Sequence, residues 1–136
     1  MNIIVCGGRD YEDWETFKRS MDRLSISRDP KRDDICIVSG HARGADSLGE
    51  RYAYEKKWKC RVFPAQWDKY GKQAGFFRNA EMLDYADGVI AFWDGKSHGT
   101  AHMIKIAKLA KRRVLVFDYY GNIRDNYIPN EKNFRR

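Results

Sequence analysis

Short, nearly continuous apolar runs alternate with longer amphipathic segments along the chain. Apolar runs of this length, closed by Gly or Pro, predict buried strands at 2–6, 35–40, 60–65, 87–93 and 113–119. Between them, apolar residues recur at helical spacing, most clearly at Trp14, Phe17, Met21 and Leu24. Helices are therefore expected at 13–24, 45–57, 78–86 and 98–112, with Asp10 or Asp13 capping the first of them.

This alternation predicts an α/β fold. Strands that are apolar throughout are typical of a parallel sheet covered by helices on both faces. With right-handed crossovers, the expected architecture is a single Rossmann-like three-layer domain whose five-stranded parallel sheet has the order 3-2-1-4-5. We expect this domain to span residues 1–118, followed by a loosely packed basic and aromatic tail at 119–136.

Three glycine-bearing loops follow the first, second and fourth predicted strands. They read VCGGRDY (5–11), VSGHARGADS (38–47) and FWDGKSHGTAHM (92–103). Glycine lets the backbone approach a ligand closely, and the helix start behind each loop offers N–H groups and a positive dipole end to an anion. The first and fourth strands flank the switch point of the predicted sheet, so the loops indicate one shared pocket for a phosphate-bearing molecule.

Several side chains in these loops have a role in such a pocket and also an ordinary alternative. Arg9 is suited to binding a phosphate or carboxylate, or else pairs with a neighbouring aspartate, and the adjacent glycines favour the first role. The N–H groups at 44–46 are expected to point at an anion. His41 is either an acid–base group or, more commonly for a loop histidine, solvent-exposed or hydrogen-bonded. Thr100 caps its helix or donates to a phosphate.

The segment QWDKYGKQAGFFRN (66–79) is predicted to be a long loop that forms a further wall of the pocket. Trp67 in it either stacks on a base or pins the loop to the body. Two other histidines, His98 and His102, are four residues apart, but no third ligand is well placed and His98 is expected to precede its helix. No metal and no cofactor are expected.

Composition narrows the class of protein. A hydrophobic content of 43% and a charged content of 33% are typical of one soluble globular domain, and no apolar run is long enough to span a bilayer. We expect a cytoplasmic protein because the chain enters a strand without a signal peptide, and Cys6, Cys36 and Cys60 are predicted to be buried, reduced thiols. The net charge of +7 favours an anionic partner, although many lysines belong to ordinary helix faces.

Four motifs in series resemble those of the SLOG superfamily, Rossmann-like nucleotide-ligand folds that include the LOG (lysine-decarboxylase-like) and DprA/Smf proteins. Within it, the chain is most similar to the YspA/cpYpsA-related SLOG family, whose pattern is approximately GGRxY, SGGARGAD, a Trp with GxxAGxxRN, and IAF followed by a Gly-rich stretch and GT. The corresponding segments here are GGRDY (7–11), SGHARGAD (39–46), QWDKYGKQAGFFRN (66–79) and IAFWDGKSHGT (90–100).

The resemblance implies a pocket for a nucleotide or a nucleotide derivative. Together with the loop chemistry it assigns ligand binding to Gly7, Gly8, Arg9, Ser39, Gly40, His41, Arg43, Gly44, Asp46, Trp67, Arg78, Asn79, Gly95, Gly99 and Thr100. Two positions depart from the related patterns. His41 replaces the second glycine of SGG, and Met103 occupies the place of the glutamate in the PGGxGTxxE motif of the LOG enzymes, which cleave the N-glycosidic bond of nucleoside monophosphates.

Three functions are compatible with these features. The first is binding of a nucleotide-derived small molecule for sensing or sequestration, for example a signal like ADP-ribose. The second is hydrolysis of an N-glycosidic bond. Because Met103 cannot act as a base in place of the LOG glutamate, Asp46, His41 or Asp94 would have to supply the acid–base group. The third is binding of single-stranded nucleic acid, as the charge and the distant likeness to DprA/Smf allow. The superfamily resemblance also implies a homo-oligomer.

Overall fold

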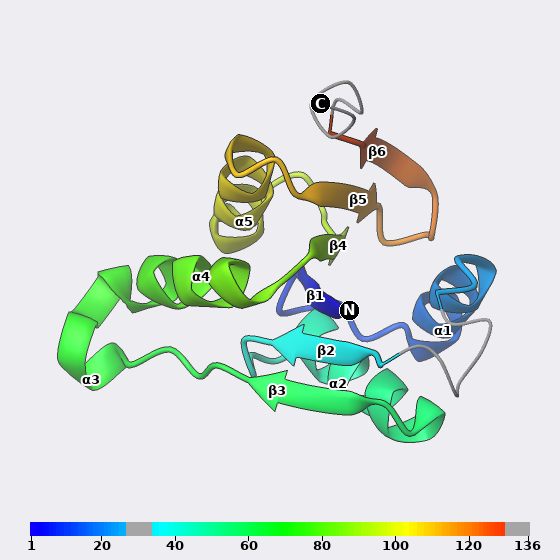
Figure 1. Ribbon diagram of the computed structural model, residues 1–136, viewed down its shortest axis with the longest axis horizontal. Helices are drawn as coiled ribbons and strands as arrows, with labels where there is room; N and C mark the ends of the chain where they lie inside the picture. Colours follow the sequence, from blue (N-terminus) through cyan, green and yellow to red (C-terminus); the bar gives the residue numbers. More distant parts are fainter. Residues whose placement is uncertain (27–33, 130–136) are drawn as a thin grey trace.

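The centre of the molecule is one six-stranded sheet of order β3-β2-β1-β4-β5-β6 (Figure 1). The computed structural model describes residues 1–26 and 34–129. The first five strands are parallel to one another, as predicted. Their order, 3-2-1-4-5, is also the predicted one. Their bounds are β1 Asn2–Gly7, β2 Cys36–Ser39, β3 Lys59–Val62, β4 Gly88–Phe92 and β5 Arg113–Phe117, and β6 is Ile123–Tyr127.

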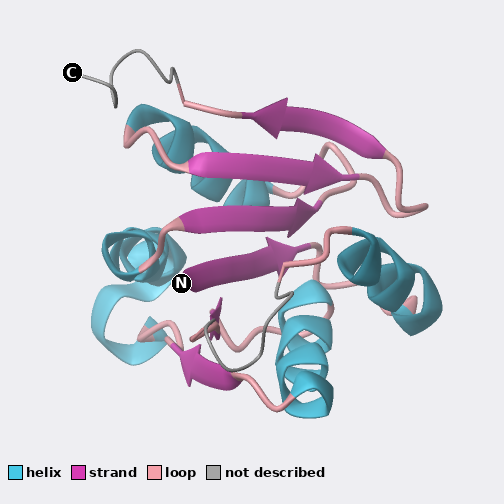
Figure 2. Cartoon of the chain, turned by 45° about the vertical axis from the view of Figure 1, so that its right-hand side comes forward, coloured by secondary structure: helices cyan, strands magenta, loops and turns pink. Residues whose placement is uncertain are grey.

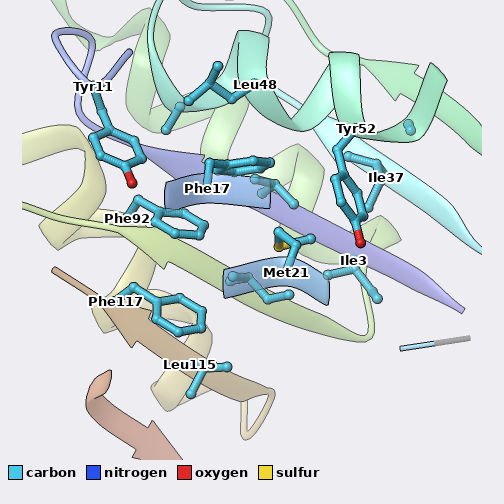
Figure 3. Packing of buried hydrophobic residues seen from close by; sticks show 14 of the residues in the cluster. Ile3, Tyr11, Phe17, Met21, Ile37, Leu48, Tyr52, Phe92, Leu115 and Phe117 are labelled. Atoms are coloured by element: carbon cyan, nitrogen blue, oxygen red, sulfur yellow. The ribbon is translucent and has the colours of Figure 1, made fainter. Parts of the chain in front are cut away.

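Helices cover both faces of this sheet, as expected for parallel strands. They are α1 Trp14–Arg23, α2 Ala45–Lys56, α3 Trp67–Tyr70, the 3-10 turn η1 Gly71–Gln73, α4 Ala74–Tyr85 and α5 His98–Leu109. One apolar cluster joins α1 and α2 to the sheet through fully buried side chains such as Phe17 and Phe92 (Figure 3). The other joins α4 and α5 to the opposite face through Met82 and Met103. None of the helices in these described ranges is both long and apolar enough for a membrane span.

The first helix shows how closely a local signal predicts structure. Asp13 is its N-cap, and one carboxylate oxygen accepts the Thr16 N–H at 3.1 Å while the other accepts the Thr16 hydroxyl at 2.7 Å. Such a cap contributes about 1 kcal/mol. Phe17 and Met21, one turn apart, are buried against the sheet. The predicted helix at 13–24 and its cap at Asp13 are therefore confirmed.

Residues 66–79 are mainly helical, so the prediction of a long loop here was wrong. Gly71, with φ +58°, ends the short helix α3 in a conformation that favours glycine, and α4 then begins at Ala74. The helical pattern was hidden because Phe76 and Phe77 of the first turn are exposed, while Ala74 is the buried residue. This region extends beyond the sheet, at the left of Figure 1.

The C-terminal segment contains an edge strand where a loosely packed tail was predicted. β6 pairs antiparallel with β5, and Figure 2 shows its arrow pointing opposite to that of the neighbouring strand. Its polar sequence, IRDNY, suits an edge strand whose residues are exposed or only partly buried. An ion pair between Lys108 and Asp125 ties it to α5. Residues 130–136, the remainder of the predicted tail, lie outside the described residues.

The cysteines are free thiols, but they are not all buried. Cys6 and Cys36 lie inside the sheet, as predicted. Cys60 is exposed because β3 is an edge strand whose residues are exposed throughout. The predicted burial of Cys60 was therefore wrong.

Candidate functional site

A cavity of about 350 Å³ opens at the carboxyl ends of β1 and β4, the switch point of the sheet. It is lined by parts of the first and second glycine loops, of α4 and of the start of α5. Among the predicted residues, its wall contains Gly7, Gly8, Arg9, Asp46, Arg78, Asn79, Gly99 and Thr100. We call this space the switch-point cavity.

Asp46, in the first turn of α2, supplies a buried carboxyl to this cavity. The residue is 5% exposed, and its Oδ2 accepts the N–H of Ala42 at 3.2 Å. Burial raises the pKa of Asp46 to about 6, although the Ala42 N–H and the charge of Arg78 favour the ionised form. The carboxyl therefore changes protonation state in a range where acid–base groups work.

Arg78 and Asn79, at consecutive positions of α4, connect the walls of the cavity. The Arg78 guanidinium donates through Nη1 to the Gly40 carbonyl at 2.6 Å and through Nε to Asn79 Oδ1 at 3.2 Å. The Asn79 amide in turn donates to the Gly99 carbonyl at 3.1 Å. Burial lowers the pKa of Arg78, but a guanidinium stays charged in a protein. A fixed positive charge thus faces the cavity beside Asp46.

The start of α5 forms an open part of the wall. A Cβ placed on Gly99 would meet no atom within 4 Å. Ser97, the N-cap residue just before the helix, makes no side-chain hydrogen bond to the helix backbone. Its hydroxyl lies 3.2 Å from that of Thr100. This 12-residue helix therefore presents its N-terminal turn, with its positive dipole end, to the cavity.

The start of α2 is closed by contrast. Gly44, with φ +77°, crosses the first loop so tightly that a Cβ there would lie 2.2 Å from the Gly8 carbonyl oxygen. The same carbonyl accepts the N–H of Ala45 at 3.1 Å. Of the N–H groups at 44–46 that were expected to face an anion, the one on Ala45 thus has a protein partner. Gly44 serves the contact between the two loops.

Asp94 and Gly95 do not line the switch-point cavity. The Asp94 carboxylate accepts the N–H groups of Lys96 at 2.8 Å and Ser97 at 2.9 Å, and these bonds lower its pKa. Gly95 has φ +82° and belongs to the same turn. The two residues shape the loop before α5, and Asp94 is not placed for acid–base chemistry in the cavity.

His41 and Ser39 form a polar cluster outside that cavity. His41 has φ +59°, in the left-handed region that favours glycine. Its N–H donates to Ser39 Oγ at 3.0 Å, and its ring Nδ1 lies 3.0 Å from Glu50, which also accepts the Ser39 hydroxyl at 2.7 Å. The His41 side chain is 58% exposed. These contacts hold the second loop in shape.

A second cavity, of about 370 Å³, adjoins the first and contains four more of the predicted residues, Gly40, His41, Arg43 and Trp67. The other predicted residues, Ser39, Gly44 and Gly95, line neither cavity. Arg9, Ala42 and Arg78 line both spaces. The second is completed by Gly40, His41, Arg43, Pro64, Ala65 and Trp67, and we call it the Trp67 cavity. The Arg9 guanidinium lies 5.8 Å from the centre of the Trp67 ring.

Sequence reasoning missed part of the site. Asp10 lines the switch-point cavity, and its carboxylate accepts the Tyr119 hydroxyl at 2.6 Å across 109 positions of sequence. No local pattern indicates a pair so far apart. The cavity also contains Cys6, Met82, Ser97 and Met103. Burial raises the pKa of the Cys6 thiol, so it is not poised as a nucleophile.

In the described ranges, no three His, Cys, Asp or Glu side chains gather in one place. His98 is the first residue of α5, not the residue before the helix. His102 lies 3.1 Å from the Asn79 amide, through ring Nδ1. The spacing of the two histidines thus reflects a helix surface next to α4.

Comparison with known proteins identifies the family of the chain. The family model described as the YspA, cpYpsA-related SLOG family matches residues 1–70, which include the first two glycine loops and Trp67. The Gene 61 protein of Mycobacterium phage D29 is 33% identical over 125 residues, covering 85% of this chain and 94% of that protein. No solved structure matches. The chain belongs to the YspA, cpYpsA-related SLOG family.

Proposed function

We propose that the protein binds a nucleotide or nucleotide-derived ligand in the switch-point cavity, for sensing or sequestration. The observation that carries the proposal is the open start of α5, which faces the same cavity as Arg9 and Arg78. Backbone N–H groups at a helix start together with two guanidinium groups are a recurring means of binding phosphate. Family membership supports a nucleotide-related role in general.

The phosphate is best placed between Gly99 and Arg9. The start of α2 is less suitable, because the N–H of Ala45 is bonded to Gly8 and because the Asp46 carboxyl lies in its first turn. An ionised Asp46 repels phosphate but accepts hydrogen bonds from sugar hydroxyls. We therefore place the sugar near Asp46 and the phosphate at α5.

Binding without turnover fits the rest of the wall. Met103, which stands where the LOG enzymes carry a glutamate, lines the cavity and is 1% exposed. A thioether neither transfers a proton nor stabilises a developing positive charge as a carboxylate does. Of the acid–base candidates, Asp94 is bonded within its own loop and His41 lies outside this cavity.

One observation favours a second function, hydrolysis of an N-glycosidic bond. Asp46 is a buried carboxyl inside the cavity, with a pKa raised to about 6. A carboxyl of that kind is suited to general acid or base catalysis near neutral pH. Release of free base from a panel of nucleoside monophosphates, abolished in Asp46→Asn, would establish this function. Absence of release from every nucleotide that binds would exclude it.

Native mass spectrometry of the protein purified from cells, followed by calorimetric titration of the nucleotide it retains, tests the binding function. Arg9→Gln is expected to weaken binding by about 10-fold or more, since a charge-assisted contact contributes about 1.5–3 kcal/mol. Arg124→Gln is the matched control, because Arg124 is an exposed arginine on β6 that lines neither cavity. Equal affinities of the two variants would contradict the proposed site.

Binding of single-stranded nucleic acid stays a prediction from the net charge and the superfamily resemblance. Self-association stays a prediction from the superfamily resemblance alone. Titration of a single-stranded oligonucleotide at two salt concentrations tests the first, because binding through phosphates weakens steeply as salt rises.

A further inference from the structure

The two adjoining cavities differ in charge. The switch-point cavity contains two carboxyls, Asp10 and Asp46, besides Arg9 and Arg78. The lining of the Trp67 cavity, in the described part of the chain, includes three arginines and no carboxyl. Glu50 contacts the His41 ring but does not line the space. A group that enters the Trp67 cavity therefore meets a net positive wall.

Arg9 and Arg78 stand at the boundary between these spaces, because both line both cavities. Arg78 is fixed there by its bond to the Gly40 carbonyl. Arg9 is exposed, with its guanidinium 5.8 Å from the Trp67 ring. An anion at this boundary would contact both arginines and would have one cavity on either side of it.

Trp67 offers the second cavity a flat apolar surface. The residue is 49% exposed, unusual for so large an apolar side chain. The edge of its indole lies next to Gly75 of α4, where a Cβ would be 3.6 Å away. An indole held against a helix, in a space lined by arginines, matches the combination by which proteins stack a nucleobase beside a phosphate.

We propose that one ligand of the dinucleotide type, two nucleosides joined through a pyrophosphate, occupies both cavities. One linking phosphate lies between Gly99 and Arg9, as in the proposed function, and the other between Arg9 and Arg78. One nucleoside then occupies the switch-point cavity, and the second base stacks on Trp67. This inference rests on the proposed function of the switch-point cavity and extends it. Each cavity, at about 350 and 370 Å³, falls in the size range of a small-ligand pocket, so one nucleoside fits in each.

Calorimetric titrations of three related ligands test the proposal. AMP fills one cavity, ADP-ribose adds a second phosphate and a second ribose, and diadenosine 5′,5′-pyrophosphate adds the second base. Diadenosine pyrophosphate is expected to bind about 10-fold or more tightly than AMP, and more tightly than ADP-ribose, because stacking of one base on an aromatic side chain changes affinity by about fivefold or more.

The variants assign the gain to Trp67. Trp67→Ala is expected to weaken diadenosine pyrophosphate by about fivefold or more and AMP by less than about twofold, and Trp67→Phe to restore most of the loss. Phe77→Ala is the matched control, because Phe77 is an exposed aromatic on α4 that lines neither cavity and should change no affinity.

The outcomes separate the two proposals. AMP binding without any gain from the second nucleoside, or an equal loss of both ligands in Trp67→Ala, overturns the dinucleotide inference and leaves the proposed function intact. Failure of all three ligands to bind overturns both. Tighter binding of a single-stranded tri-adenylate than of diadenosine pyrophosphate, with a steep loss at high salt, would assign the Trp67 cavity to a nucleic-acid strand and overturn the inference.

Discussion

The helices α2 and α5 begin in the same way in sequence and differently in structure. Each follows a parallel strand and a glycine loop, and each has its start near the switch-point cavity. At α2 the glycine is packed against Gly8 and the Ala45 N–H is bonded. At α5 the space around Gly99 is open, and the N-cap residue Ser97 makes no side-chain hydrogen bond to the helix backbone. The loop before α2 is therefore used for contacts within the protein. The loop before α5 leaves its helix start open to a ligand.

The comparison teaches that glycine before a helix has two uses. One is close contact between chain segments, which needs a missing side chain because protein atoms already fill the space. The other is close approach of a ligand, which needs the same absence while the space is still empty. Only the atoms around the glycine distinguish these uses.

The largest expected effect is on stability, from alanine at the two glycines. Gly44→Ala places a Cβ 2.2 Å from the Gly8 oxygen, at φ +77°, and should lower the free energy of unfolding by about 3 kcal/mol or more. Gly99→Ala should change it by less than about 1 kcal/mol. Urea unfolding midpoints check both values. Similar losses at the two sites would remove the distinction between them.

A comparable effect is expected from the carboxyl in the first turn of α2. Asp46 has a pKa raised from 3.8 to about 6, so the folded state binds the proton more tightly than the unfolded state. Its contribution to stability is therefore greatest below pH 4 and declines as pH rises through 6.

Asp46→Asn removes this dependence. At pH 8 the variant should be more stable than the wild type by up to about 3 kcal/mol, since each pKa unit corresponds to about 1.4 kcal/mol. Below pH 4 the advantage should vanish. Unfolding midpoints between pH 4 and 8 measure it. A variant that is less stable at pH 8 would show that the ionised carboxylate stabilises the fold.

An intermediate effect is expected on ligand binding. Gly99→Ala puts a methyl group into the open space at the start of α5, so phosphate cannot approach as closely. Affinity for AMP should fall by about 10-fold, or about 1.4 kcal/mol. Calorimetry on the folded variant measures the loss. Ala101→Gly, two residues further along the same helix, is a control for changes in helix propensity. An equal loss there would contradict a local steric effect.

The smallest effect concerns the histidine that replaces a glycine of the family pattern. His41 occupies φ +59°, which is unfavourable for a side chain by about 1–2 kcal/mol. His41→Gly should raise the free energy of unfolding by about 1 kcal/mol, reduced by loss of the contact with Glu50. Lys57→Gly, at φ +60° just after α2, is the matched comparison. A destabilised His41→Gly beside a stabilised Lys57→Gly would show that the Glu50 contact dominates.

Much of the fold was predictable because its signals are local and repeated. Apolar runs and helical spacing, with the handedness of crossovers, gave the order of five strands and the place of the switch point. The sixth strand was not predicted, because IRDNY lies at a solvated edge of the sheet and lacks an apolar run. The start of α4 was not predicted as helix, because its exposed phenylalanines and Gly75 give a sequence pattern typical of a loop.

The residues around the candidate site were predictable in outline, but their contacts were not. Arg78 and Asn79 followed from the family pattern, and both line the cavity. The pair of Asp10 and Tyr119 depends on two segments that only the folded sheet brings together. Asp94 looks equivalent to Asp46 in sequence, but it bonds to its own turn while Asp46 is buried in the cavity. Such differences arise from tertiary packing, which the residue types do not encode locally.

Backbone amide chemical shifts during a titration with AMP test the central claim most directly. The account predicts that the largest shifts occur at Gly99 and Thr100, at the start of α5, and at Gly8 and Arg9 beside it. The amide of Ala45, bonded to Gly8, should move much less. Largest shifts at the start of α2, with none at α5, would contradict the claim that α5 provides the phosphate site.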